Sequence, residues 1–211
     1  MPDFPEEHDP QRDACLAAIA QACRAARFDV HPLRETPSLR MAAAFHQRGE
    51  GFVLVRKATL WAAEIHEYLY VYTPRDLNAS LWRDIRDDAL DRGLTRIRAH
   101  DEHMTSYVSA VLLCRSWDIG MADAVRRTRF IKSFLWGLHG WARLRTLAVR
   151  LPPSKDAPAV LACNASARNA LLPLIRDALS PLFPLAPERN RPLFTFPPRK
   201  GGVSNVKGPF R

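Results

Sequence analysis

The stretch YLYVY at residues 68–72 decides the fold class, because aromatic and aliphatic side chains alternate along it. This period of two indicates a β-strand, on which the three tyrosines would share one face of a sheet. The preceding residues are also rich in β-branched and aromatic types. Two segments favour turns, namely residues 48–51, which contain two glycines, and the mostly polar residues 64–67. We therefore predict a three-stranded antiparallel meander within residues 39–72.

Helices are predicted on both sides of this meander. Asp9 before Pro10 is typical of an N-cap with proline at the first helical position, and apolar residues recur at helical spacing until about residue 28. Thr73 before Pro74 predicts a second helix in the same way, and Gly93 is placed to end it as a C-cap.

The rest of the chain alternates between strands and helices. Residues 107–114 are nearly all apolar, which is typical of a central strand. The patterns further predict a helix at 122–138, strands at 144–151 and 158–163, and a helix at 166–182 that kinks or begins at Pro173.

This order predicts one α/β (α+β) domain over residues 1–183, with a mixed sheet that contains the meander and is flanked by helices. Restriction-endonuclease-like domains share the opening order of elements. Metal-dependent nucleases of that fold need Glu-x-Lys or Asp-x-Lys on a strand to bind the ion and activate water. Neither triplet occurs in the chain, so this chemistry is not expected here.

Composition points to a basic protein of a reducing compartment. The net charge of +9 favours encounters with polyanions such as nucleic acid, an anionic membrane or an acidic protein. The four cysteines form no C-x-x-C pair and are expected to be buried free thiols. No signal peptide or transmembrane stretch is evident, and a cytoplasmic location is therefore expected.

A long basic segment carries the main functional prediction. Between Ala124 and Ser154 there are seven Lys or Arg residues and no acid. On the predicted helix 122–138, three bases occupy the arc opposite the apolar residues, and such a stripe can track phosphates. The predicted nucleic-acid contacts in this segment are Arg126, Arg129, Lys132, Arg143 and Arg145.

Two glycines follow the predicted helix, in the sequence GLHGW at residues 137–141. They permit positive φ angles and a tight reversal of the chain. Trp136 and Trp141 beside them either stack on a base or pack in the core, and core packing is expected.

The last residues, 184–211, form a basic, proline-rich tail. Six bases against one acid give it a charge of +5, and it contains three phenylalanines. Such a segment is expected to be extended. It either solubilises the domain, binds nucleic acid through Arg199, Lys200 and Lys207, or docks on an acidic protein partner.

A polar cluster before the central strand is the candidate metal site. His100 and His103 would share a face on a helical turn and could bind a divalent metal together with Glu67. Glu64 and His66 are further donors in the same predicted turn. The alternative is a loop in which one histidine forms local hydrogen bonds. No other cofactor is predicted.

The stretch from residue 57 to residue 151 resembles an uncharacterised prokaryotic domain family of unknown function. The residues that carry the resemblance are Lys57-Ala58, Trp61-Ala62, Glu67-Tyr68, His100, His103-Met104, Lys132-Ser133-Phe134, Gly137, Gly140 and Trp141. The resemblance implies that His103 and the Gly-Trp turn belong to a recurring design, and it implies no activity.

The first functional hypothesis is a protein that binds RNA, or a ribonucleoprotein, through the basic helix and tail. The second is a metal-dependent hydrolase or phosphodiesterase centred on His100 and His103. The third is an adaptor that docks its tail on an acidic protein. Peripheral membrane binding is a lesser option, because the apolar arc of helix 122–138 is expected to pack on the core.

Overall fold

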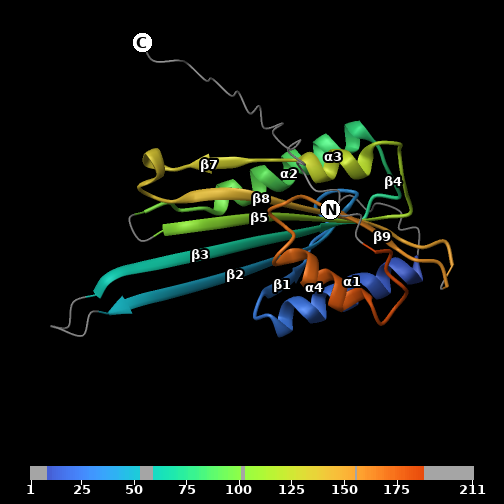
Figure 1. Cartoon of the computed structure of the whole chain (residues 1–211), viewed down its shortest axis with the longest axis horizontal. Helices are drawn as coiled ribbons and strands as arrows, with labels where there is room; N and C mark the ends of the chain where they lie inside the picture. Colours follow the sequence, from blue (N-terminus) through green and yellow to red (C-terminus); the bar gives the residue numbers. More distant parts are fainter. Residues whose placement is uncertain (1–8, 53–58, 101–102, 155, 188–211) are drawn as a thin grey trace, which may run out of the picture.

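The computed structural model describes residues 9–52, 59–100, 103–154 and 156–187 (Figure 1). Its centre is a seven-stranded mixed sheet of order β1-β2-β3-β5-β8-β7, with β9 also paired to β8. The helices of the described part are α1 (Pro10–Ala25), α2 (Ala79–Arg96), α3 (Met121–Arg127) and α4 (Leu171–Leu179). The strands are β1 (Asp29–Pro32), β2 (Leu39–Phe52), β3 (Thr59–Tyr72), β4 (Asp76–Leu77), β5 (His103–Cys114), β6 (Ser116–Trp117), β7 (Ile131–Ser133), β8 (Trp141–Arg150) and β9 (Val160–Cys163).

The predicted fold class is confirmed. Strands β1, β2 and β3 form an antiparallel meander, of which β1 lies before the predicted range 39–72, and β5 and β8 extend the sheet in parallel with β3. The central position predicted for residues 107–114 is also correct, since β5 lies between β3 and β8. None of the described helices is long and apolar enough to cross a membrane.

The predicted turns inside the meander were wrong. Residues 48–51 belong to β2 and residues 64–67 belong to β3, in one long antiparallel pair. His46 lies opposite His66 in this pair, and Gln47 lies opposite Ile65. The polar residues that suggested turns are thus paired across β2 and β3. A long hairpin can carry polar side chains on the part of its surface that no helix covers.

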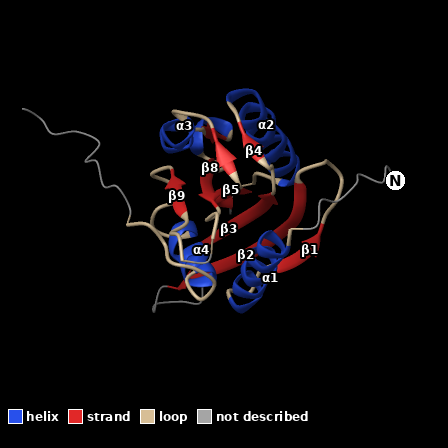
Figure 2. Cartoon of the chain, turned by 90° about the vertical axis from the view of Figure 1, so that its right-hand side faces the viewer, coloured by secondary structure: helices blue, strands red, loops and turns tan. Residues whose placement is uncertain are grey.

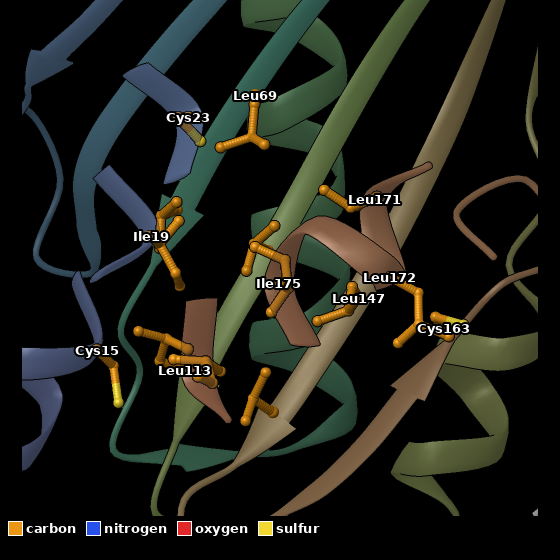
Figure 3. Close-up of a cluster of buried hydrophobic side chains, with 14 of the residues drawn as sticks. Cys15, Ile19, Cys23, Leu69, Leu113, Leu147, Cys163, Leu171, Leu172 and Ile175 are labelled. Atoms are coloured by element: carbon orange, nitrogen blue, oxygen red, sulfur yellow. The ribbon is translucent and has the colours of Figure 1, made fainter. Parts of the chain in front are cut away.

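Two helix pairs cover the two faces of the sheet (Figure 2). On one face, α1 and α4 pack against alternate residues of β3, β5 and β8, including Leu69, Leu113 and Leu147 (Figure 3). On the other face, α2 and α3 cover the three tyrosines of YLYVY, which share that face as predicted. Each added layer removes apolar surface from water, and this burial stabilises the sheet.

The four cysteines are free and buried, as predicted. Burial raises the pKa of the thiols of Cys15, Cys23 and Cys114 to about 12. These groups therefore remain protonated at neutral pH and act as small apolar side chains.

The second helix begins later than predicted. Residues 76–77 form β4 against β6, and the Asn78 side chain then caps α2 by accepting a hydrogen bond from the Leu81 N–H at 2.9 Å. Gly93 is not a C-cap, because α2 continues to Arg96. It is buried at the point where α2 crosses β5, and a Cβ there would lie 2.4 Å from a methyl carbon of Val108.

The helix predicted at 122–138 is correct only as far as Arg127. Helix α3 ends at Arg127, and the chain then pairs with β8 through β7 before a 3₁₀ turn (η1) at Leu135–Gly137. Strand formation satisfies the polar backbone of β8 at its open edge, which outweighs the helical spacing of apolar residues in this segment.

The last helix is shorter than predicted and begins at Leu171, so Pro173 lies in its first turn, where its missing N–H costs no helical bond. The predicted tail boundary at residue 184 falls where backbone hydrogen bonds join Pro184 and Ala186 to Ala159. The tail bases Arg199, Lys200 and Lys207 lie outside the described residues.

We predict that Gly93→Ala lowers the free energy of unfolding by about 1–3 kcal/mol, because the added methyl group overpacks the contact with the rigid Val108 side chain. Urea denaturation measures this loss. In the background of Val108→Ala, which opens the contact, the same glycine substitution should cost less or become stabilising, since alanine favours the helix. Equal costs in both backgrounds would contradict the packing argument.

Candidate nucleic-acid interface

One face of the sheet is only partly covered by helices. Strands β3, β5 and β8 extend past α1 and α4 at their N-terminal ends (Figure 1). The side chains there continue the rows that pack under α1 and α4 further along the same strands, because alternate residues share a face. We call the part of this face that is formed by Ile65, Glu67, Thr105, Tyr107, Trp141 and Arg143 the open face.

Aromatic and cationic side chains lie next to one another on the open face. Trp141 is 40% exposed and Arg143, two residues along the same strand, is also exposed. Tyr107 lies opposite Arg143 in the register of β5 and β8. The surface therefore offers both a ring for stacking and a guanidinium group within one strand repeat, which is about 7 Å.

Arg145 has a structural role beneath this surface. Its Nη1 donates a hydrogen bond to Glu67 at 2.6 Å, and the Ser109 hydroxyl donates to the same carboxylate at 2.9 Å. Its guanidinium group lies 3.5 Å from the centre of the Tyr107 ring. Because Arg145 is buried and paired, it is not free to bind a phosphate, and it holds Tyr107 in place instead.

A cationic cavity lies beside the open face, at the outer edge of β8. It has a volume of about 500 Å³ and we call it the arginine notch. Its lining includes four arginines and the polar residues Thr128, Asn164 and Ser166. The lining residues are Arg126, Arg127, Thr128, Arg129, Phe130, Ile131, Arg143, Leu144, Asn164, Ala165 and Ser166.

Most of the positive charge in the notch is not neutralised by neighbours. Arg126 forms an ion pair with Asp123 at 3.0 Å. For Arg127, Arg129 and Arg143, there is no ion pair with any residue that the structure describes. The absence of acids between Ala124 and Ser154, seen in the sequence, is the origin of this excess.

The predicted cationic stripe is divided by the true secondary structure. Arg126 and Arg129, which were predicted as contacts together with Arg143, line the notch with it. Lys132 lies opposite Ala142 in β8 and therefore points to the other face of the sheet. Of the five bases predicted in this segment, the structure brings three together, and it separates Lys132 and Arg145 from them.

Asn164 braces the notch from inside and was not predicted. Two strands share the outer edge of β8: β7 pairs with residues 141–143 and β9 with residues 147–150. In the gap, the Asn164 side chain accepts from the N–H groups of Thr146 and Ala167 and donates to the carbonyls of Thr128 and Leu144. It thus replaces the missing strand pairing. A polar residue after an apolar strand, N-terminal to a helix, was the only signal in the sequence.

The turn at residues 137–141 is confirmed in its backbone but not in its side chains. Gly137 and Gly140 adopt φ values of 94° and 76°, as the two glycines predicted. Core packing of Trp136 and Trp141 was wrong, because Trp136 is 96% exposed and Trp141 is partly exposed. A Cβ on Gly140 would clash with backbone of Met104, so glycine is required there for close approach as well.

The polar cluster lies on the other face of the sheet, towards α2. Glu64 Oε2 is 3.1 Å from His100 Nε2 and 3.3 Å from His66 Nε2. Buried His103 contacts the carbonyl of His139 through Nδ1 at 2.6 Å. A carbonyl only accepts, so Nδ1 carries the proton and Nε2 is left to accept from Ser106 at 2.8 Å.

The structure does not bring His100, His103 and Glu67 together. Glu67 alternates with His66 along β3 and bonds to Arg145 on the open-face side of the sheet. Both ring nitrogens of His103 are engaged, as in the alternative of local hydrogen bonding. Among the described residues, no group of three His, Cys, Asp or Glu side chains is arranged to hold a metal ion.

Electrostatic coupling within the cluster shifts two pKa values. Burial acts to raise the pKa of Glu64, but the charge of His100 and the hydrogen bonds from His100 and His66 outweigh it and lower the pKa. Burial, followed by repulsion from His46, lowers the pKa of His66. Glu64 is therefore ionised at neutral pH, and His66 is held in its neutral form.

A family model described as a domain of unknown function, DUF8052, matches residues 18–157. The chain belongs to this family. The match contains the whole stretch 57–151 whose resemblance to an uncharacterised domain family was noted in the sequence, and it extends back into α1. The DUF8052 match ends before β9 and α4, so Asn164 lies outside it. Searches of curated proteins and of solved structures gave no match to this DUF8052 protein.

We predict that Asn164→Ala destabilises the protein by about 2–4 kcal/mol, because it leaves several buried backbone groups without partners. Thermal or urea unfolding measures the loss. Asn78→Ala is the matched control, since it removes one exposed capping bond and should cost only about 1 kcal/mol. Equal losses for the two variants would argue against the bracing role.

We predict that stability falls as the pH drops below about 6.5, the ordinary pKa of histidine. Since folding lowers the pKa of His66, the unfolded chain takes up the proton first, and the stability from neutral His66 is lost as pH falls through the folded pKa. The variant His66→Gln should show a smaller loss between about pH 7 and pH 5 in urea denaturation. An identical pH profile in the variant would contradict this assignment.

Proposed function

We propose that this protein binds single-stranded nucleic acid, with RNA as the expected ligand, on the open face and in the arginine notch. The observation that carries the proposal is the position of Arg143, which lines the notch and also lies beside Trp141 on the open face. One strand thus connects a cationic cavity to an exposed aromatic ring.

The notch supports binding of phosphate groups. Guanidinium groups donate bidentate hydrogen bonds that match phosphate oxygens, and three of the four here have no ion pair with a described residue. Their mutual repulsion is relieved when an anion enters. The volume of about 500 Å³ admits a phosphate together with the sugar attached to it.

The open face supports stacking of unpaired bases. Any of the nucleic-acid bases can stack on an exposed aromatic ring of a sheet, whatever the sequence. The ring of Trp141 lies close to Gly137, since a Cβ added to that glycine would come within 3.4 Å of the ring. Tyr107 is fixed by Arg145, and both rings are therefore positioned before a ligand binds.

Duplex DNA is a poorer fit to this surface. Sequence readout in the major groove needs a protruding helix or a two-stranded ribbon lined with polar side chains. The notch is flanked instead by the end of α3, and the nearest hairpin, β7–β8, ends in apolar residues. We further propose, from the sequence alone, that the tail bases Arg199, Lys200 and Lys207 contact the nucleic acid.

We expect the purified protein to bind fluorescently labelled oligouridine RNA in a salt-dependent manner, measured by fluorescence polarisation. Trp141→Ala should weaken binding by about tenfold, since loss of one stacked base costs about 1–3 kcal/mol. Arg143→Ala should weaken binding and reduce the slope of log affinity against log salt by about 0.7.

Arg83→Ala is the matched control for these variants. Arg83 is an exposed arginine on α2, on the other side of the sheet, so its loss removes the same charge without touching the proposed site. Equal effects of Arg83→Ala and Arg143→Ala would reduce the binding to a general effect of net charge. Binding that does not depend on salt would overturn the proposal.

A further inference from the structure

The end of the β7–β8 hairpin exposes a cluster of large apolar side chains that the nucleic-acid proposal does not use. We call residues 134–140 the hairpin tip; they lie at the end of β7 and β8, away from β9 (Figure 1). Leu135 is 54% exposed, Trp136 96% and Leu138 74%, and Ile131 at the base of the tip is 64% exposed. Ile131, Leu135 and Leu138 belong to the apolar arc of the predicted helix 122–138, which was expected to pack on the core.

The backbone of the tip is held in one conformation by its own hydrogen bonds. The N–H of Phe134 donates to the carbonyl of Gly140, and the carbonyl of Phe134 accepts from the N–H groups of Gly137 and His139. The N–H of Leu138 donates to the carbonyl of Leu135 at 3.0 Å. Leu135 and Trp136 adopt positive φ values of 44° and 58°, which non-glycine residues rarely do. Strain of this kind persists where the surroundings hold it and is often found at functional sites.

We infer that the hairpin tip inserts into the interfacial region of an anionic lipid bilayer. Bases of RNA stack on aromatic rings and gain little from leucines, whereas a lipid interface accepts both. Five of the seven N–H groups of the tip, those of Phe134 and of residues 137–140, donate to carbonyls within the tip, which lowers the cost of insertion. The tip is also a protruding turn, which can enter a bilayer without the rest of the fold opening.

Charge around the tip specifies the type of membrane. Lys132 is exposed on β7 next to the tip, and Arg129 and Arg143 follow at the base of the hairpin. No acid occurs between residue 125 and residue 153, so nothing on this hairpin repels an anionic headgroup. Basic residues beside an inserted apolar turn bind anionic lipids preferentially.

Cosedimentation with lipid vesicles tests this inference with the full-length protein. We expect binding to vesicles of phosphatidylcholine mixed with phosphatidylglycerol, and weaker binding to phosphatidylcholine alone. The double variant Trp136→Ala/Leu138→Ser should lose about tenfold or more in partitioning, because it removes the largest exposed apolar groups. Lys132→Ala should reduce binding to the mixed vesicles only.

Ile119→Ser is the matched control, since Ile119 is a fully exposed aliphatic residue in a loop before α3 and its loss should leave vesicle binding unchanged. Leu138→Ser alone should give a partial loss and provides a second, milder variant. Thermal unfolding of each variant reports whether the fold is intact.

Failure of the wild-type protein to pellet with mixed vesicles would overturn the inference, as would unchanged pelleting of the double variant. The same double variant measured with labelled RNA separates the two ligands. If it loses RNA affinity as strongly as Trp141→Ala, the tip belongs to the nucleic-acid surface and the membrane inference is wrong. Retained RNA binding with lost vesicle binding supports it, whatever the outcome for the open face.

Discussion

The division of the outer edge of β8 between two partners is the constraint on which the functional part of this molecule depends. A strand buried in the middle of a domain must satisfy every N–H and C=O group along its edge. Here β7 satisfies the first part of β8 and β9 the last part. The residues between them are satisfied by the carbonyl of Phe130 and by Asn164.

This division creates the other features of the site. The gap between β7 and β9 is where the arginine notch lies, and α3 provides its wall through the bond from Thr146 to the Val125 carbonyl. The short pairing of β7 places a tight turn at the end of the sheet, away from the covering helices. Exposed apolar side chains on that turn and unneutralised arginines in the gap therefore come from the same edge.

Unequal lengths of strands and helices explain the open face. The pairs β2–β3 and β3–β5 are longer than α1 and α4, so the N-terminal ends of β3, β5 and β8 extend past the layer that buries Leu69 and Leu147. Polar groups that enter this zone are tied to one another, as Glu67, Ser109 and Arg145 are. On the other face, Glu64 plays the corresponding role for His66 and His100.

Local pattern was a sufficient guide wherever one side of an element is apolar and the neighbours lie close in the chain. The mixed-sheet fold class, the central strand, the shared face of the YLYVY tyrosines and the burial of the cysteines all follow from periodicity and composition, whereas the bounds of the meander strands did not. The excess of arginine after Ala124 was equally visible, since charge can be counted without coordinates.

Long-range pairing settled the rest. Residues 128–138 have helical spacing, yet β8 offered them an unpaired edge, and the hydrogen bonds gained there turned a helix into a strand and a tight turn. The same pairing exposed Leu135 and Trp136 and divided Lys132 from Arg129. The register of β3 with β5 placed Glu67 and His103 on opposite faces. The face of a sheet on which a residue lies depends on the register of its strand with a distant strand. The local sequence does not determine that register.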